Sequence, residues 1–415
     1  MKRIAVIGAG ISGLAAAYLL SRRHEVSLLE RDNRLGGHTH TIRVAGDRGE
    51  IPLDTGFLVH NRQTYPNLVR LFDELGVGTR PSDMSFSVRC TQTGFEYSSR
   101  GLGGVFAQPR NLLNPDQYRL LLDIVRFNRE APDVLLPGAP RHTLDTFVKT
   151  RGFGEAFVAR YLVPMTSAIW SASVATIREF PMTTLVRFMS NHGMLSLASP
   201  VPWRVVAGGS DTYVAPLVRP LGDRVHRGCP PAAIRREHGG VTVTLRDGSA
   251  HRFDEIVLAC HGDEVLPLLS DPSEAERETF AAFKTTGNEA VLHTDATMLP
   301  VQPRAWASWN YQLGAASDQP PIVTYHLNRL QGLNERTQYC VTLNPPRPIP
   351  ASAVIARMVY RHPQFTAATE EAQLRWRSVS AERHTHFCGA YWRYGFHEDG
   401  LLSAMRVAAD LGVEW

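Results

Sequence analysis

The first thirty residues alternate between apolar runs and short breaks in a β-α-β pattern. Apolar residues 4–7 predict a strand, the alanine-rich segment 12–20 predicts a helix, and apolar residues 26–29 predict a second strand. Glycines separate the first strand from the helix, and Glu30 ends the second strand. The pattern predicts one βαβ unit of a parallel sheet.

Further along the chain the periodicity changes from helical to strand-like. Residues from about 81 to 200 are predicted to be mainly helical. Segment 225–260 alternates apolar and polar positions with glycine turns at 239–240 and 247–248, and residues 280–375 are strand-like and rich in proline. A short strand at 386–390, a loop and a helix starting near Gly400 are expected at the end.

The segment 115–136 carries apolar positions at helical spacing with arginines between them. One interpretation is a helix packed on the core with a solvated arginine face. The other is an interfacial helix lying on anionic lipid, which requires arginines flanking the apolar face. The sequence leaves both open.

Composition narrows the class of protein. The 415 residues, 43% of them hydrophobic, provide material for two to three domains. A net charge of +4 with only three lysines is too small and dispersed to indicate nucleic-acid binding. Five scattered cysteines without a C-x-x-C pair indicate a reducing compartment, and no apolar run approaches the length of a membrane span. We expect a cytoplasmic protein that can contact a membrane peripherally; oligomeric state is not predicted.

The glycine turn has the spacing G-x-G-x-x-G at Gly8, Gly10 and Gly13. Gly8 permits a tight turn, Gly10 lets the backbone approach a pyrophosphate, and Gly13 lets the helix pack close to the strand. The helix N-terminus supplies free N–H groups and partial positive charge to the phosphates. Glu30 is placed to accept hydrogen bonds from a ribose, and its charge disfavours a 2′-phosphate.

The residues after Glu30 continue as E-x-x-x-R-x-G-G, and "IPLDTGFLVHN" follows at 51–61. In these motifs the sequence resembles the flavin-containing amine oxidase superfamily, which includes phytoene-type desaturases and protoporphyrinogen oxidases. The resemblance implies FAD and an α/β fold: a Rossmann-like FAD-binding domain built from discontinuous segments, with a mixed α+β substrate domain, as in amine oxidases and p-hydroxybenzoate hydroxylase. It assigns residues 1–80, 203–275 and 380–415 to the FAD-binding domain, and 81–202 and 276–379 to the substrate domain.

The resemblance also implies a set of FAD contacts. Relatives usually carry arginine where this chain has His38, and an acid where it has Ala390; Glu398 or Asp399 is expected to compensate for the missing acid. The helix from Gly400 and Leu401 is expected to face the flavin's pyrimidine edge. Besides the three glycines and Glu30, the expected contacts are Ile11, Ser12, Arg31, Arg34, Gly36, Gly37, His38, Thr39, Asp54, Thr55, Gly56, Phe57, Ala232, Gly389, Ala390, Glu398, Asp399, Gly400 and Leu401.

Several longer segments, among them "DTGFLVHNRQTYPNLVRLFDELGV", "IWSASV", "NEAVLHTD" and "FHEDGLLSA", resemble a bacterial branch of FAD-binding oxidoreductases. That branch is associated with the synthesis of cyclopropane, methyl-branched and furan fatty acids. The resemblance implies desaturation or oxidation of a fatty acyl chain by hydride transfer to flavin N5. An atypical amine oxidase, a flavin-dependent isomerase without net redox change, and a flavoprotein partner of a methyltransferase remain alternatives.

Removing two hydrogens from an acyl chain requires an apolar tunnel, a hydride acceptor and a base. We expect His397 to be the base, with His60 second, and Phe396 to form part of the wall beside the flavin. Many flavin amine oxidases carry a lysine near N5, and here Asn288 or Glu289 falls at its position, so Glu289 is a further catalytic candidate. Neither metal-ligand spacing nor a G-x-S-x-G motif is present, so no metal is expected and serine hydrolysis has no support.

Overall fold

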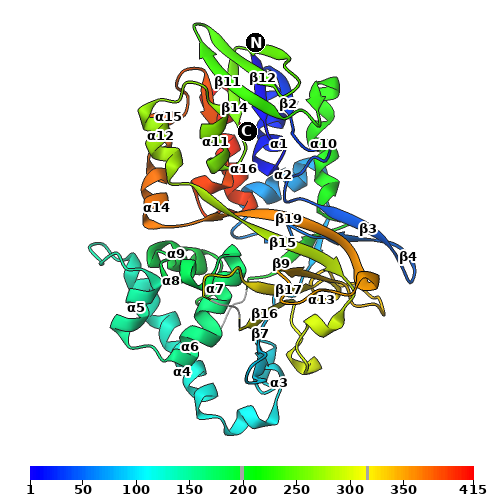
Figure 1. Ribbon diagram of the computed structural model, residues 1–415, viewed down its shortest axis with the longest axis vertical. Helices are drawn as coiled ribbons and strands as arrows, with labels where there is room; N and C mark the ends of the chain where they lie inside the picture. Colours follow the sequence, from blue (N-terminus) through cyan, green and yellow to red (C-terminus); the bar gives the residue numbers. More distant parts are fainter. Residues whose placement is uncertain (197–200, 315–316) are drawn as a thin grey trace.

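The computed structural model describes residues 1–196, 201–314 and 317–415. Two layered units are stacked along the long axis (Figure 1). A parallel sheet with its helices, carrying both chain termini, lies at one end, and a larger mixed sheet with a group of helices lies at the other. Two long strands, β15 (Lys284–His293) and β19 (Val354–Gln364), run across the region between the two units.

The parallel sheet has β1 at its centre, because its apolar side chains are covered on both faces. Helix α1 (Ile11–Leu20) follows β1 and packs against the C-terminal helix α16 (His397–Asp410). The predicted βαβ unit and Rossmann-like α/β fold are confirmed. The strand order is β10 (Val225–His226), β2 (Glu25–Leu29), β1 (Arg3–Ile7), β14 (Glu255–Leu258) and β20 (Thr385–Phe387).

An antiparallel three-stranded sheet accompanies the parallel one, with β12 and β13 in contact with β14 and β1. Gly239 and Gly248 adopt positive φ at its two turns, as the glycine pattern predicted. Its strands are β11 (Pro231–Glu237), β12 (Gly240–Leu245) and β13 (Ala250–Phe253). Helices of this unit are α2 (Pro66–Leu75), α10 (Val214–Val218), α11 (Gly262–Leu268), α12 (Glu274–Ala281), α14 (Ala367–Leu374) and α15 (Trp376–Val379).

The larger sheet has seven strands in the order β19, β15, β18 (Cys340–Leu343), β17 (Ile322–His326), β16 (Trp309–Leu313), β7 (Phe86–Cys90) and β8 (Glu96–Ser98). The strand-like character of 280–375 is thereby confirmed over most of its length. The predicted helical region began at about residue 81, but residues 86–98 form strands β7 and β8, so this part of the prediction is wrong. β7 pairs in parallel with β16, more than 200 residues away, and local periodicity cannot reveal such a partner.

The helical prediction holds from about residue 101 to 191; its last part, 197–200, lies outside the described residues. These helices form the end of the molecule opposite the parallel sheet (Figure 1). They are α3 (Gly101–Val105), α4 (Pro115–Glu130), α5 (Leu144–Arg151), α6 (Glu155–Phe157), a π-helical segment Val158–Leu162, α7 (Val163–Trp170), α8 (Val174–Arg178) and α9 (Met182–Asn191).

Two hydrophobic cores fill the units, one around the parallel sheet and one around the seven-stranded sheet. Trp203 and Phe396 pack against both cores, so the two units meet at these rings. The remaining elements are a hairpin of β3 (Thr41–Gly46) and β4 (Gly49–Asp54), a small sheet of β5 (His60–Asn61), β9 (Trp203–Val206) and β6 (Thr79–Pro81), and helix α13 (Leu327–Leu330). The exact domain boundaries stay a prediction.

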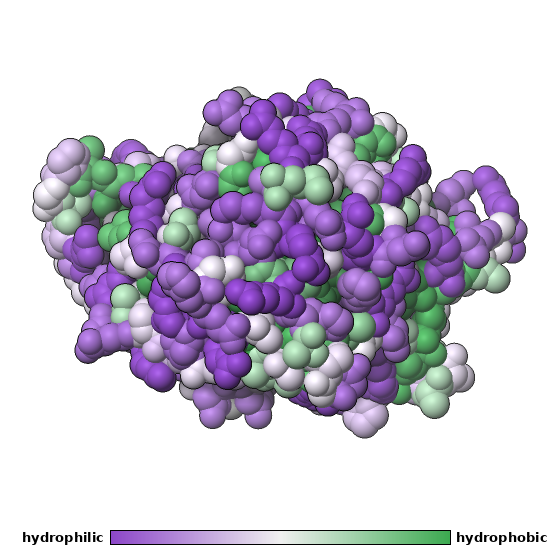
Figure 2. All heavy atoms as spheres, turned by 90° about the horizontal axis from the view of Figure 1, so that it is seen from above, coloured by the Kyte–Doolittle hydropathy of each residue, from purple (hydrophilic) through white to green (hydrophobic). Residues whose placement is uncertain are grey.

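Among the described helices, none combines the length and apolarity needed to cross a membrane. The face above the parallel sheet is mostly hydrophilic, with apolar groups at its margins (Figure 2).

Candidate FAD and substrate site

One continuous cavity of about 780 Å³ extends from the loop after β1 to helices α7 and α9. Its first half is formed by the glycine-rich loops at the carboxyl ends of the parallel strands, which is where open α/β sheets bind their ligands. Its second half is formed by apolar and aromatic side chains between the two units. The site therefore has room for a dinucleotide and, beyond it, for an apolar ligand.

The three motif glycines have different surroundings. Gly8 has φ +99°, and a Cβ there would lie 2.9 Å from the carbonyl oxygen of Ala259. A Cβ on Gly13 would lie 1.8 Å from the carbonyl oxygen of Gly8, so α1 could not pack as it does. A Cβ on Gly10 would meet nothing within 4 Å, and this residue lines the cavity. The loop thus leaves open space beside Gly10, where a pyrophosphate fits.

The N-terminus of α1 and the carboxylate of Glu30 complete the nucleotide half. No acidic residue lies in the first turn of α1, and Gly10 offers no side-chain cap to its N–H groups. Glu30 is buried and lines the cavity, and its carboxylate accepts hydrogen bonds from the backbone N–H of Ala9 (2.7 Å) and Asp32 (3.0 Å). Each oxygen keeps a second lone pair for a ligand hydroxyl. These residues fit FAD, with its phosphates at α1 and a ribose at Glu30.

A Glu30→Gln variant should bind FAD about ten- to hundredfold more weakly, because a charged acceptor for the ribose becomes neutral. The amide also cannot accept from both backbone N–H groups. The measurement is titration of apoprotein with FAD, followed by flavin fluorescence. Glu25→Gln, at the start of the strand that Glu30 follows and half-exposed, is the control. Equal affinity of both variants and wild type would contradict the ribose contact.

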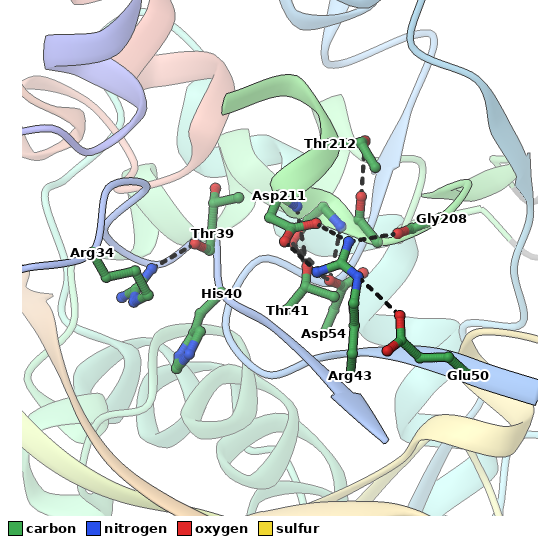
Figure 3. Close-up of polar contacts among 12 residues, drawn as sticks. Arg34, Thr39, His40, Thr41, Arg43, Glu50, Asp54, Gly208, Asp211 and Thr212 are labelled. Atoms are coloured by element: carbon green, nitrogen blue, oxygen red, sulfur yellow. Dashed lines mark hydrogen bonds and ion pairs between the residues drawn. The ribbon is translucent and has the colours of Figure 1, made fainter. Parts of the chain in front are cut away.

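Arg34 shapes the loop behind the cavity and does not line it. Its guanidinium donates to the backbone carbonyls of Leu35 (3.1 Å), Gly37 (2.7 Å) and Thr39 (2.8 Å), the last contact being drawn in Figure 3. The neighbouring Gly36 and Gly37 have positive φ and do line the cavity. The predicted direct FAD contact of Arg34 is therefore corrected: the side chain holds the loop carbonyls away from the cavity.

Thr39, Asp54 and Thr55 likewise lie behind the lining. Asp54 accepts from Thr41 Oγ1 (2.6 Å) and from the N–H and Oγ of Ser210 (2.8 Å each), among the residues of Figure 3. Thr55 bonds the Tyr360 hydroxyl at 2.6 Å. Their predicted FAD contacts are corrected to support of the adjacent Gly56 and Phe57, which line the cavity.

At the C-terminal end, α16 begins at His397, three residues before the predicted start. Glu398 turns away from the cavity and caps α2, accepting from the N–H groups of Asn67 (3.1 Å) and Leu68 (2.9 Å). Asp399 caps α16 itself by accepting from the N–H of Phe396 at 3.0 Å. Both carboxylates therefore bind backbone N–H groups at helix N-termini. The prediction that one of them takes the place of the acid missing at Ala390 is wrong.

Gly400 and Leu401 also lie outside the cavity lining. A Cβ on Gly400 would come within 2.7 Å of Ser12 Oγ, so this glycine serves the packing of α16 on α1. Leu401 is fully buried in the core. Gly389, Ala390, Ile11, Ser12 and Arg31 line the cavity, and their contacts with FAD stay a prediction.

The buried carboxyl group of Asp399 predicts a pH dependence of the protein's stability. Burial raises the pKa of Asp399 to about 7, against the opposing hydrogen bond from Phe396 and the charge of Arg393. The unfolded side chain titrates near 4. Between these values the folded state holds the proton more tightly, so Asp399 lowers the free energy of unfolding as pH rises from about 4 to about 7.

Asp399→Asn keeps an oxygen that can accept from Phe396 and removes this titration. The variant should be more stable than wild-type apoprotein by about 2 kcal/mol or more at pH 8, and by much less at pH 4. Denaturant unfolding at both pH values measures the difference. The same difference at both values would contradict the buried, titrating carboxyl group.

The surroundings of His397 and His60, the two histidines predicted as bases, do not suit that role. His397 lines the cavity, but its Nε2 bonds both Thr39 Oγ1 and Tyr213 hydroxyl at 3.0 Å, its ring stacks on Phe57 at 3.7 Å, and burial lowers its pKa to about 3. His60 is buried beside Phe72 outside the lining, and burial lowers its pKa to about 4. Neither ring is a good proton acceptor at neutral pH.

Two further candidates are corrected. Glu289 lies on the outward side of β15, half-exposed, and pairs with Arg357 at 2.6 Å. It cannot reach the cavity. Ala232 is exposed at a bulge of β11, and the neighbouring Pro230 and Pro231 line the cavity instead.

A group of neutral histidines lies on the cavity wall, and only one of its members was predicted there. His38 was expected there, but His261 and His362 join it, with ring centroids 6.1 Å and 5.3 Å from that of His38. Burial lowers the pKa of all three, to about 4 for His362. In the described part of the chain no three His, Cys, Asp or Glu side chains are arranged to hold a metal.

The apolar half of the cavity was expected only in outline. Phe396 lies in its wall, stacked on Phe188 with centroids 4.9 Å apart. The described lining residues that belong to α7, α9, β7, β16 and β17 include no Asp, Glu, Lys or Arg; the charged lining residues come from the parallel-sheet unit and from β15 and β19. The lining of the apolar half includes Leu58, Val59, Tyr65, Met84, Phe86, Met165, Ala168, Ile169, Trp170, Phe188, Met194, Trp203, Trp309, Tyr325, Tyr394 and Phe396.

Comparison with known proteins agrees with this site. The family model for flavin containing amine oxidoreductases matches residues 11–294, more than half of the chain. The chain belongs to this family, which confirms the predicted superfamily and its FAD cofactor.

Among its relatives is AofH of Mycobacterium tuberculosis, provisionally named a flavin-containing monoamine oxidase, which is 27% identical over 329 residues, 77% of this chain and 69% of AofH. Among solved structures, cyclohexylamine oxidase from Brevibacterium oxydans has a TM-score of 0.70 at 16% identity, covering 99% of both chains. A fatty acid isomerase from P. acnes that produces CLA has a TM-score of 0.68 at 18% identity, covering 97% of both. These two likenesses establish the fold alone.

Proposed function

We propose that this FAD-dependent oxidoreductase acts on a fatty acyl chain, most simply by desaturating it. The observation that carries the proposal is the uncharged lining of the apolar half of the cavity. An alkyl chain gains about 0.8 kcal/mol for each methylene buried there. An alkylammonium ion would lose its hydration without a carboxylate to replace it, so the lining favours the acyl chain over an amine.

FAD, when bound, would accept the hydride, which carries both electrons that leave the acyl chain, and the proton of the neighbouring carbon would be released to solvent. The chain's own residues hold the substrate and exclude water. Three methionines, Met84, Met165 and Met194, let the wall adapt to a branched chain because their side chains are flexible and polarisable. Trp170 and Phe396 border the same space and restrict where the chain can bend.

Mass spectrometry of lipids from cells with and without the protein tests this function. Cells with the protein should contain acyl chains two mass units lighter than chains that accumulate without it. Met165→Asp, which places a charge in the apolar half, should abolish the difference while FAD content remains normal. Identical lipids in both cells, or a double bond that only changes position, would contradict desaturation; the second result would support an isomerase.

We also propose peripheral membrane contact through the end of the molecule that carries α3 and α4. This end lies far from the parallel sheet (Figure 1). Leu113 (88% exposed) and Leu122 (70% exposed) belong to it, and the exposed Arg119 and Arg129 of α4 lie on either side of Leu122 in the sequence. Other exposed apolar side chains of this surface are Leu102, Leu112, Tyr118, Val125 and Leu136.

A Leu113→Asp/Leu122→Asp variant should lose co-sedimentation with vesicles containing phosphatidylglycerol. Leu374→Asp, equally exposed on α14, should retain it. Vesicle binding that is unaffected by the double substitution would contradict this surface.

A further inference from the structure

Three polar side chains, Asn344, Asn288 and His362, form a hydrogen-bonded series that ends at the cavity. Asn288 lies on β15 and is fully buried; it is one of the two residues, with Glu289, expected at the position of the lysine that many flavin amine oxidases carry. His362 lies on the neighbouring strand β19 and lines the cavity.

Backbone groups fix the orientation of the first side chain. Asn344 Oδ1 accepts from the N–H of Glu289 (3.1 Å), which can only donate. Asn344 Nδ2 donates to the carbonyl of Pro321 (2.9 Å), which can only accept. The same Nδ2 donates to Asn288 Oδ1 at 2.7 Å. The amide of Asn344 therefore has one possible orientation, and Asn288 Oδ1 must be the acceptor.

The orientation of the Asn288 amide determines which ring nitrogen of His362 carries the proton. Because Oδ1 of Asn288 accepts, its Nδ2 donates: the shortest contact is to His362 Nδ1 (3.0 Å), followed by the carbonyls of Ser171 (3.2 Å) and Thr286 (3.4 Å). An imidazole nitrogen that accepts carries no proton, so the proton of the neutral ring lies on Nε2. Within the described residues, Nε2 of His362 has no hydrogen-bond partner in the protein and is not enclosed.

The surroundings keep the ring uncharged at neutral pH. Burial lowers the pKa of His362 to about 4, and the nearby His261 acts in the same direction. Arg361, the adjacent cation, is paired with Asp263 (2.5 Å) and Glu264 (3.0 Å). His38, 5.3 Å away, is also neutral.

We propose that this series presents His362 Nε2–H to the cavity as a fixed, uncharged hydrogen-bond donor, which binds an acceptor oxygen there. The oxygen is the acyl carbonyl of the ligand or that of a bound water molecule. His362 is thus a positioning residue that favours ligands with an acceptor oxygen and disfavours ammonium ions, which have no lone pair. The identity of the ligand rests on the proposed function; the tautomer does not.

The tautomer is tested by ¹⁵N NMR of histidine-labelled protein at pH 7, with His362→Gln to assign the resonances. The chain contains two internal references. His293 Nδ1 accepts from the N–H of Asp295 (3.1 Å), so it carries its proton on Nε2. His192 Nδ1 lies 2.8 Å from the carbonyl of Phe188, so it carries its proton on Nδ1. His362 should match His293; a match to His192, or a doubly protonated ring, would overturn the proposal.

Asn288→Asp tests whether the amide of Asn288 fixes the tautomer of His362. A carboxylate can only accept, so His362 should gain a proton on Nδ1 and its pKa should rise by about 1–3 units, while His293 is unchanged. An unchanged His362 would overturn the proposal. If this variant does not fold, the ¹⁵N NMR measurement of the His362 tautomer in the wild-type protein still tests the proposal.

The proposed acceptor oxygen is tested with two probes, methyl palmitate, which has an ester carbonyl, and hexadecane, which has no oxygen. The preference for the ester should fall about tenfold in His362→Leu, which has no donor. A shift of the Nε2 resonance with the ester alone identifies the substrate carbonyl as the acceptor. If neither probe shifts the resonance and the Nε2–H is hydrogen-bonded to water, the bound water molecule is the acceptor. An Nε2–H without any acceptor in both cases would overturn the proposal. Failure of acyl oxidation with the tautomer intact would refute the proposed function alone.

Discussion

Gly10→Ala should leave the stability of the apoprotein nearly unchanged and weaken FAD binding, whereas Gly13→Ala should damage the fold itself. A methyl group on Gly10 meets no atom within 4 Å, and it enters the space we assign to the pyrophosphate. The backbone of Gly10 is extended with φ −73°, which alanine adopts easily. We expect a free energy of unfolding within about 0.5 kcal/mol of wild type and an FAD affinity reduced about ten- to hundredfold.

Gly13 is the matched comparison, three residues further along the same motif. Its Cβ would collide with the carbonyl oxygen of Gly8, a backbone atom that cannot rotate away. We expect a loss of about 1–3 kcal/mol or more in the apoprotein, with FAD binding lost as a consequence of the shifted helix. Thermal unfolding of both apoproteins and FAD titration separate the effects. If Gly10→Ala destabilised the apoprotein as much as Gly13→Ala, the open space beside Gly10 would be refuted.

Arg236→Met should destabilise the FAD-binding unit by about 3–5 kcal/mol, because it leaves the carboxylate of Glu276 buried without its charge partner. Both side chains are nearly inaccessible, and two guanidinium nitrogens of Arg236 contact Glu276 at 2.5 and 3.0 Å. Arg236 also binds Asp271 at 3.0 Å, joining β11 to the start of α12. Urea unfolding of the apoprotein measures the loss.

The adjacent Arg235 provides the control. It pairs with Glu237 at 2.8 Å on the surface of the same strand, and Arg235→Met should cost about 0–1 kcal/mol. The double variant Arg236→Met/Glu276→Met should recover most of the stability, since no charge remains buried. If Arg235→Met and Arg236→Met lowered the free energy of unfolding equally, burial of the ion pair would not determine the loss of stability.

Local pattern predicted the parts of the site that lie within one short segment. The spacing of Gly8, Gly10 and Gly13 between a strand and a helix predicted the loop that borders the cavity, because the βαβ unit is local and its packing requires Gly8 and Gly13. The βαβ limits also agreed with the structure within one residue.

Contacts between distant segments could not be read in this way. Glu398 caps a helix some 330 residues earlier in the chain, and nothing near Glu398 in sequence indicates this partner. His362 reaches Asn288 through the antiparallel register that sets Asn288 opposite Tyr360. His397 was expected to be a base from its neighbours in sequence, but Phe57, Thr39 and Tyr213 surround it in space.

Anaerobic mixing of the oxidised holoprotein with substrate tests the central claim most directly. A phospholipid with a methyl-branched acyl chain should bleach the flavin absorbance, and simple alkylamines of similar length should not. Bleaching by amines and by no lipid would contradict the account and make the protein an amine oxidase with an unusual site.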